Sequence, residues 1–215
     1  MPGNRRAFLL ALAFAGALTA QPADPPKDKR FVIVLIGPTG SGKTTQSEFL
    51  QRKFNIPTVA VDDLIRDNPA ALAKYQRPGI DSGTPQSNPA LNDLIRERLV
   101  AMDLKKGVAL DGYPATKDQA DHLAALVRER SWPAPIVIQF EVPDSVVRER
   151  LERRKGPEDT PELIERRLKD YHRELDMIRD YYPEANLWKV DGMRPAADVS
   201  STIEAILKDE MPPKR

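Results

Sequence analysis

The 215-residue chain contains no cysteine, which excludes disulfide bonds, thiolate metal sites and a cysteine nucleophile. It has only two histidines, His122 and His172. Both lie in polar helical stretches where solvated side chains are expected, so no histidine metal cluster is predicted. An excess of charge is also lacking, because 33 basic residues oppose 32 acidic ones. The chain therefore has no net electrostatic field that would favour binding to nucleic acid or to a membrane surface, and ligand binding must depend on local sites.

Internal repeats and low-complexity tracts are absent as well. No basic patch interleaved with aromatic residues is found, so nucleic acid is not a predicted partner. A chain of this length is long enough for one well-buried domain and too short for two. We therefore expect a single core and, at near-neutral charge, a monomer.

No apolar run reaches the roughly 20 residues that a transmembrane helix needs. The run at residues 7–20 is shorter and follows the basic start MPGNRR. This pattern predicts a signal peptide over residues 1–20, a flexible linker over 21–28 and a domain over 29–215.

The arginine pair within this segment, Arg5 and Arg6, is also found in twin-arginine signals. A Sec signal with an incidental arginine pair and an uncleaved N-terminal anchor are the alternatives. We expect an exported protein, periplasmic or secreted, with no stable membrane span once the signal is removed. A cytoplasmic protein is expected if this segment does not function as a signal.

From residue 29 onward, short β-branched runs alternate with longer helical patterns. The run FVIVLIG is continuously apolar, which is typical of a strand buried on both faces. This alternation predicts an α/β fold in which a five-stranded parallel sheet lies between two layers of helices. A turn-rich stretch over residues 77–89 predicts a loop. The predicted strands are 31–37, 58–61, 107–111, 135–142 and 186–190, and the predicted helices are 42–54, 88–104, 116–130, 144–154, 161–181 and 196–208.

Residues 37–44, GPTGSGKT, match the phosphate-binding pattern G-x-x-x-x-G-K-[ST] between a predicted strand and a predicted helix. Backbone N–H groups of such a loop surround phosphate oxygens, and the following helix adds its positive N-terminus. Lys43 supplies a charge to the β- and γ-phosphates, and the Thr44 hydroxyl ligates Mg²⁺. The loop does not identify the acceptor, because GTPases, ATPases and kinases share it. The predicted ATP-binding residues are Gly37, Gly40, Ser41, Gly42, Lys43, Thr44 and Thr45, with Mg²⁺ as cofactor.

Three further segments point to a known family. VDDLIRD at 61–67 follows the second predicted strand, LDGYPATKDQAD at 110–121 follows the third, and VRERLERRKGPEDTPELIERRLKDYH spans 147–172. With the phosphate loop, these segments resemble the adenylate kinase family of nucleoside monophosphate kinases, in the same order. The resemblance implies a P-loop kinase with a small acceptor-binding helical segment and a very short lid. It also implies transfer of the ATP γ-phosphoryl group to AMP or a related nucleoside monophosphate.

The resemblance implies roles for individual residues. Arg66 would pair with the α-phosphate of the acceptor beside Asp63, and Gln119 would read the adenine edge of the acceptor. Taken alone, Arg66 would be a solvated arginine and Gln119 a surface amide. Asp111 would join Thr44 at the metal, holding Mg²⁺ through water. The implied catalytic residues, which stabilise charge on the phosphoryl oxygens, are Lys43, Arg150, Arg154 and Arg167.

Several positions depart from the family's pattern. Ala115 stands where the family has an arginine that binds the acceptor phosphate, and Lys117 or Arg77 could replace that arginine. Val61 stands in place of a threonine that contacts the acceptor base, and the lid is reduced to residues 155–160. These departures leave two alternatives open, namely a P-loop kinase of another small acceptor and a non-catalytic nucleotide-binding protein.

Overall fold

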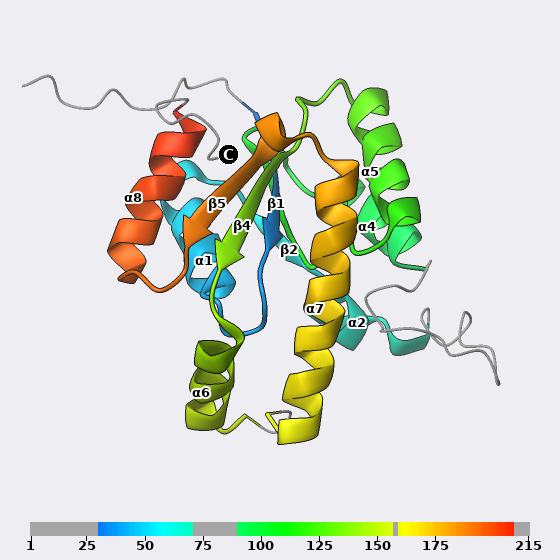
Figure 1. Ribbon diagram of the computed structural model, residues 1–215. Coiled ribbons are helices and arrows are strands. Elements are labelled where there is room, and N and C mark those ends of the chain that lie inside the picture. Colours follow the sequence, from blue (N-terminus) through cyan, green and yellow to red (C-terminus); the bar gives the residue numbers. More distant parts are fainter. Residues whose placement is uncertain (1–29, 71–89, 157–158, 209–215) are drawn as a thin grey trace, which may run out of the picture.

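The computed structural model describes residues 30–70, 90–156 and 159–208, so the predicted signal, linker and 77–89 loop lie outside it. Five parallel strands form one sheet in the order β2-β3-β1-β4-β5, with helices on both faces (Figure 1). The predicted three-layer α/β fold is thus confirmed. The elements are β1 (Phe31–Ile36), α1 (Lys43–Phe54), β2 (Thr58–Ala60), α2 (Val61–Asp67), α4 (Ala90–Ala101), β3 (Gly107–Asp111), α5 (Lys117–Glu129), β4 (Ile136–Glu141), α6 (Asp144–Arg154), α7 (Pro161–Tyr181), the 3₁₀ turn η2 (Glu184–Asn186), β5 (Leu187–Asp191) and α8 (Ala196–Leu207).

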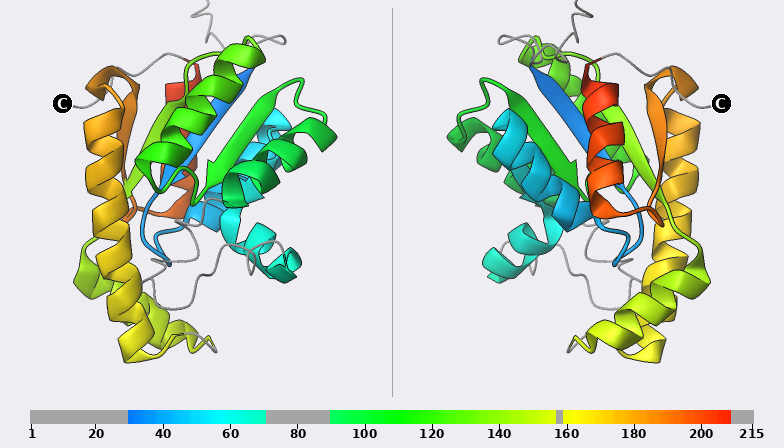
Figure 2. Two further views of the ribbon diagram at one scale, coloured as in Figure 1. Left: turned by 90° about the vertical axis from the view of Figure 1, so that its right-hand side faces the viewer. Right: turned by 90° about the vertical axis from the view of Figure 1, so that its left-hand side faces the viewer.

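Strand β1 lies at the centre of the sheet and is buried along its whole length. Its side chains alternate between the two faces. Val32 and Val34 pack in the cluster that includes α4, α5 and α7, whereas Ile33 and Leu35 pack with α1 and α8. Figure 2 shows these two helical layers from opposite sides. Burial on both faces explains the uninterrupted apolar run, and it fixes the strand from which the phosphate loop leaves the sheet.

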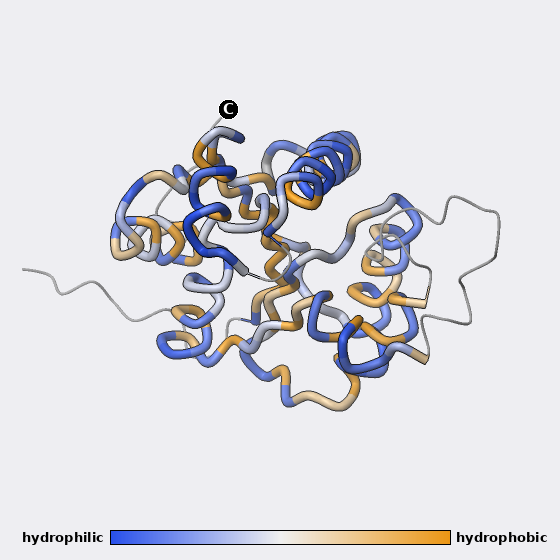
Figure 3. Tube along the Cα trace, turned by 90° about the horizontal axis from the view of Figure 1, so that it is seen from below, coloured by the Kyte–Doolittle hydropathy of each residue, from blue (hydrophilic) through white to orange (hydrophobic). Residues whose placement is uncertain are grey.

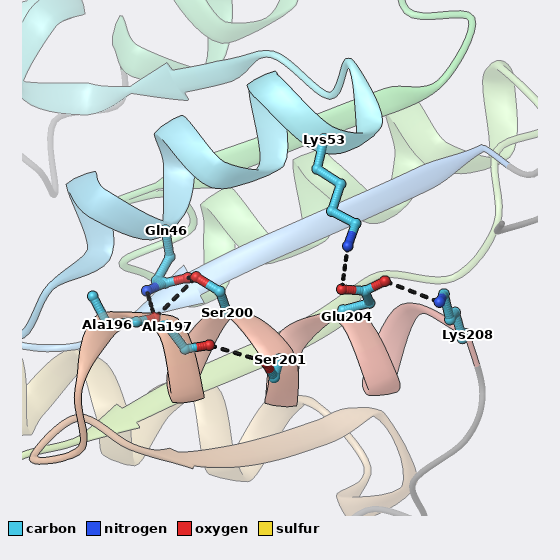
Figure 4. A network of polar contacts seen from close by, with 8 residues as sticks. All are labelled: Gln46, Lys53, Ala196, Ala197, Ser200, Ser201, Glu204 and Lys208. Atoms are coloured by element: carbon cyan, nitrogen blue, oxygen red, sulfur yellow. Dashed lines mark hydrogen bonds and ion pairs between the residues drawn. The ribbon is translucent and has the colours of Figure 1, made fainter. Parts of the chain in front are cut away.

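Polar contacts join α1 to α8 along their length (Figure 4). Gln46, which is only 2% exposed, donates from Nε2 to the carbonyl oxygen of Ala196 at 3.1 Å and accepts from the Ser200 hydroxyl at 2.8 Å. Farther along, Lys53 Nζ lies 2.5 Å from a carboxylate oxygen of Glu204. Because α1 begins inside the phosphate loop, these contacts hold the start of that helix in a fixed position.

Helix α6 and the first half of α7 extend beyond the C-terminal edge of the sheet as an arm (Figure 1). The arm has its own small core, with Leu151 of α6 against Ile164 and Leu168 of α7. Helix α7 starts where the sequence predicts: Thr160 is the N-cap, accepting from the Leu163 N–H, and proline occupies the first position. The arm therefore carries the predicted arginines on a packed scaffold.

The two histidines have different surroundings. His172 is exposed and lies 3.0 Å from a carboxylate oxygen of Asp144. His122 is not a solvated residue as predicted, because it is partly buried with Nδ1 3.0 Å from the Tyr113 hydroxyl, which donates to Asn92. Burial lowers the pKa of His122. In the described ranges, no cluster of three or more acidic or histidine side chains is arranged to hold a metal, and no helix has the length and hydrophobicity to cross a membrane.

Candidate active site

The phosphate loop connects β1 to α1 through two glycines in the left-handed region. Gly40 has a φ of 82° and Gly42, the N-cap of α1, has a φ of 99°. Other residues reach these angles only with strain. A Cβ at Gly40 would also come within 3.2 Å of Leu151 on α6. The loop is closed by a bond from the Ser41 N–H to the Pro38 carbonyl oxygen at 3.0 Å, and the Ser41 side chain is buried.

Lys43 lies across the loop. Its Nζ donates to the carbonyl oxygens of Gly37 at 2.6 Å and Pro38 at 3.2 Å. The two residues that follow, Thr44 and Thr45, are exposed in the first turn of α1, where backbone N–H groups have no partner within the helix. An ammonium group above a glycine loop at a helix N-terminus is a binding site for polyphosphate.

Asp111 is the last residue of β3 and pairs in register with Leu35 of β1. Its carboxylate oxygen lies 3.8 Å from Lys43 Nζ, and its side chain is 18% exposed. Burial raises the pKa of Asp111, and Asp62 and Asp63 raise it further, whereas Lys43 opposes the shift. The carboxyl ends of parallel strands are where open α/β sheets bind ligands, so Asp111 stands where the sequence predicted it.

A pocket of about 710 Å³ opens between the phosphate loop, α2 and α7. Viewed toward this end of the molecule, hydrophobic residues gather along the strands and hydrophilic ones on the surrounding helices (Figure 3). The pocket brings together five predicted site residues from four separate segments, namely Gly37 and Lys43 of the phosphate loop, Arg66, Asp111 and Arg167.

The predicted arginines of the arm take different positions. Arg150 joins two loops, because it donates to the carbonyl oxygens of Gly40 at 3.1 Å and Gly192 at 3.0 Å. It therefore ties the phosphate loop to the β5–α8 connection. Arg154 and Arg167 both approach Asp159, with Arg154 Nε at 2.7 Å and Arg167 at 3.5 Å. Of the three arginines, Arg167 lines the pocket described above.

Asp159 was not singled out from the sequence, although it lies in the predicted lid. Its side chain is fully buried between Arg154 and Arg167, and it accepts from the Gly156 N–H at 2.9 Å. The hydrogen bond from Arg154 lowers the pKa of this carboxyl well below its usual range. The carboxylate thus neutralises two predicted catalytic arginines at the hairpin between α6 and α7. Of the lid segment 155–160, residues 157–158 lie outside the described ranges.

The predicted acceptor-binding residues Arg66 and Gln119 lie in different surroundings. Arg66 is 68% exposed and pairs with Asp63 at 2.8 Å and Asp67 at 3.4 Å, all on α2. Gln119 is buried, not a surface amide, and its Oε1 accepts from the Ala115 N–H at 2.7 Å. It lies outside the described lining of the pocket, whereas Arg66 belongs to it.

Neither residue predicted to replace the arginine missing at position 115 is found in the described lining of the pocket. Ala115 itself is buried. Lys117 is 72% exposed and pairs with Asp121 on the outer face of α5, away from the pocket. Arg77 lies outside the described residues. The structure also adds a pocket residue that the sequence reasoning missed, Glu174 of α7. Helical spacing from Arg167 (i, i+7) was the only signal that could have found it.

Comparison with known proteins agrees with this geometry. The family model described as "Adenylate kinase" matches residues 35–187, which is most of the chain. The chain belongs to the adenylate kinase family. It is 33% identical over 183 residues to an adenylate kinase of a Cyanothece species, covering 81% of this chain and 94% of that protein. It is 35% identical over 153 residues to one of Mycobacteroides abscessus, covering 70% and 84%. Membership makes this protein an ATP-dependent phosphotransferase and confirms the predicted nucleoside monophosphate kinase function.

Proposed function

We propose that this adenylate kinase family member transfers the γ-phosphoryl group of ATP to AMP, forming two molecules of ADP, and that it acts as a monomer. The observation that carries the proposal is one pocket that is lined by Lys43, Asp111 and Arg66. It supports a donor triphosphate at the loop and an anionic acceptor under α2. The relatives described above are themselves named adenylate kinases.

In this reaction an oxygen of the AMP phosphate attacks the γ-phosphorus, and the bond from that phosphorus to the β-phosphate oxygen breaks. The pair of electrons of the broken bond stays on the leaving ADP oxygen. Lys43 is the group placed to hold that negative charge, because its Nζ lies over the loop carbonyls of Gly37 and Pro38. The transition state is loose, so the enzyme acts by positioning and by electrostatic stabilisation.

The arginines of the arm have distinct parts in the proposal. Arg150 positions the donor loop, because it binds the backbone of both Gly40 and Gly192. Arg167, from the pocket wall, reaches the transferring group. Arg154 acts with it once phosphate oxygens compete with Asp159 for the two guanidinium groups. Planar guanidinium groups suit this role because each donates two parallel hydrogen bonds to an oxyanion.

The donor set also fits Mg²⁺, which prefers hydroxyl, carboxylate and water oxygens. Thr44 would supply its hydroxyl from the first turn of α1. Asp111 would hold the ion through water from the end of β3, and a cation there would offset the burial that raises the pKa of Asp111. When bound with ATP, Mg²⁺ neutralises charge that develops on the phosphate oxygens.

For the acceptor we propose that Arg66 binds the phosphate of AMP, after exchanging its bonds to Asp63 and Asp67 for phosphate oxygens. Gln119 reads the base only if its buried side chain turns toward the pocket. A second candidate is a kinase of another small acceptor, and it is favoured by Ala115, where no cation of the described chain faces the pocket from α5.

An acceptor panel tests this proposal. The purified chain is mixed with ATP and Mg²⁺ and with AMP, CMP, UMP, GMP or dAMP, and the diphosphates formed are quantified. We expect ADP from AMP at the highest kcat/KM. Transfer to none of the five, with ATP bound, would contradict the proposal and leave another acceptor or a non-catalytic nucleotide-binding protein.

We also propose that residues 1–20 act as an export signal. The support is the sequence alone, a basic start followed by an apolar run too short to span a membrane. Cell fractionation with sequencing of the mature N-terminus tests this. We expect the protein outside the cytoplasm and cleaved near residue 20, and a twin-arginine route predicts that replacing Arg5 and Arg6 by lysine stops export. Recovery of the intact chain in the cytoplasm would contradict the proposal.

A further inference from the structure

Glu174 is a carboxyl group in the substrate pocket to which no role has been assigned. It lies on α7, lines the pocket with Lys43, and is partly buried. Among the described residues, no hydrogen bond or ion pair is found for its side chain. A carboxyl group withdrawn from water without a partner is costly when it is ionised.

The charged groups around Glu174 do not compensate it. Asp170 on the same helix and Asp62 at the start of α2 are both acidic, and Arg173 already pairs with Asp170. Lys43 is attractive, but its ammonium group is bonded to the loop carbonyls. Burial raises the pKa of Glu174 to about 7, Asp170 and Asp62 raise it further, and Lys43 and Arg173 oppose the shift.

A bound polyphosphate would change this balance strongly. Glu174 lines the same pocket as Lys43 and Arg167, and Lys43 is close enough to act on its charge, so phosphates bound by these cations come near Glu174. An ionised carboxylate repels the phosphate oxygens there. A protonated carboxyl group donates a hydrogen bond to one of them, and such bonds to an oxyanion are short and strong.

We propose that Glu174 is a substrate-binding residue that takes up one proton from solvent when the paired phosphates bind, and then donates a hydrogen bond to a phosphate oxygen. The proton returns to solvent when the products leave. This inference rests on the proposed function, because it needs phosphates from both substrates in the pocket. It makes affinity for the substrate pair decrease as the pH rises above 7.

The probe is a bisubstrate analogue with two adenosines joined by five phosphates. Because each of its phosphates is bridged on both sides, the ligand itself exchanges no proton near pH 8. Titration calorimetry of the full chain in two buffers of different ionisation enthalpy, with and without Mg²⁺, measures the protons taken up on binding. The variants are Glu174→Gln, which keeps the shape of the side chain, and Glu165→Gln. Glu165 lies on the same helix but pairs with Arg148 outside the pocket lining, so it is the matched control.

For the wild type and Glu165→Gln we expect an uptake of about 0.9 proton at pH 8 and almost none at pH 5.5, where a group of pKa near 7 is already protonated. The dissociation constant should rise nearly tenfold from pH 8 to pH 9. For Glu174→Gln we expect no uptake and a flat dependence. Equal uptake in the wild type and Glu174→Gln, or none in the wild type at pH 8, would overturn the role of Glu174 alone. Failure of the analogue to bind at any pH would contradict the proposed function and this inference together.

Discussion

The donor and acceptor halves of the pocket differ in how much of each is already in place without substrate. On the donor side, Lys43 and Arg150 are bonded to backbone carbonyl oxygens that are themselves fixed by the sheet and by the loop. On the acceptor side, Arg66 is exposed, and its partners among the described residues are the acids Asp63 and Asp67 of its own short helix. Position 115 offers an alanine.

This difference indicates which substrate must order protein side chains when it binds. A triphosphate meets donors that need little rearrangement, which lowers the entropic cost of binding. An acceptor must first separate Arg66 from Asp63, and it gains fewer charge-assisted bonds in return. We therefore expect ATP to bind more tightly than AMP, and substitutions on the donor side to have the larger effects.

The largest effect is expected for Lys43→Met. Removing the charge that holds the leaving oxygen should lower kcat by about 10²- to 10³-fold. The melting temperature should stay close to that of the wild type, because the ammonium group bonds to two loop carbonyls and lies 3.8 Å from Asp111 at the pocket surface, not in the hydrophobic core. Steady-state kinetics and thermal unfolding check this against Lys105→Met, an exposed lysine paired with Asp103. Full activity of Lys43→Met would contradict the role proposed for the donor half of the pocket.

Arg150→Ala sharpens the comparison, because it acts on the donor side without changing the phosphate loop sequence. It deletes two charge-assisted bonds, to Gly40 and Gly192, so the KM for ATP should rise about 10- to 100-fold. The KM for AMP should change far less. The control is Arg153→Ala, which removes an exposed arginine of the same helix that pairs with Glu149. An equal rise in both KM values would show that the two halves are not separate.

Glu174→Gln probes the boundary between the halves in the free protein. Its pKa is raised from 4.5 to about 7, so the folded protein holds a proton that the unfolded chain releases between those values. The contribution of Glu174 to the free energy of unfolding therefore falls as the pH rises from 4.5 to 7 and is constant above pH 7. Removing the charge should increase the free energy of unfolding at pH 8 by roughly 3 kcal/mol. Denaturant unfolding at pH 8 and pH 4.5 measures this gain, which should vanish at the lower pH. A gain that is the same at both values would contradict it.

The smallest effect is expected for Ala115→Arg, which should bring the acceptor half closer to the donor half. A guanidinium beside the acceptor phosphate should lower the KM for AMP about tenfold and leave the KM for ATP unchanged. Because Ala115 is buried, unfolding must be measured first to show that the variant folds. If the folded variant has an unchanged KM for AMP, the acceptor phosphate does not bind near position 115.

The sequence was sufficient for the fold and for the position of the phosphate loop between β1 and α1. The β1 run predicted a central strand, and Thr160 followed by Pro161 predicted where α7 begins. Local rules decide these features, because they depend on periodicity, capping and the backbone angles that glycine permits. Helix α2, with only seven residues, was reached through the resemblance and not through periodicity.

What the sequence could not predict depends on contacts between distant segments. The burial of Asp159 between Arg154 and Arg167 requires the arm to fold back on itself. Gln119 is a polar residue that would be expected at the surface, but it is buried and accepts a hydrogen bond from the Ala115 N–H. Glu174 lies on a charged helix whose pocket-facing side was not distinguishable by charge alone. In each case tertiary packing, not local preference, decides the environment of the side chain.

In the reverse reaction, ADP and Mg²⁺ alone occupy both halves of the pocket, so this reaction shows whether the two halves act together. Purified protein is incubated with ADP and Mg²⁺, and ATP and AMP are quantified over time, with Lys43→Met prepared in parallel to exclude a contaminating kinase. We expect the wild type to form ATP and AMP in equal amounts. The rate of their formation by Lys43→Met should be lower by about 10²- to 10³-fold. Two results would contradict this prediction. Either the wild type leaves ADP unchanged, or the wild type and Lys43→Met form ATP and AMP at the same rate.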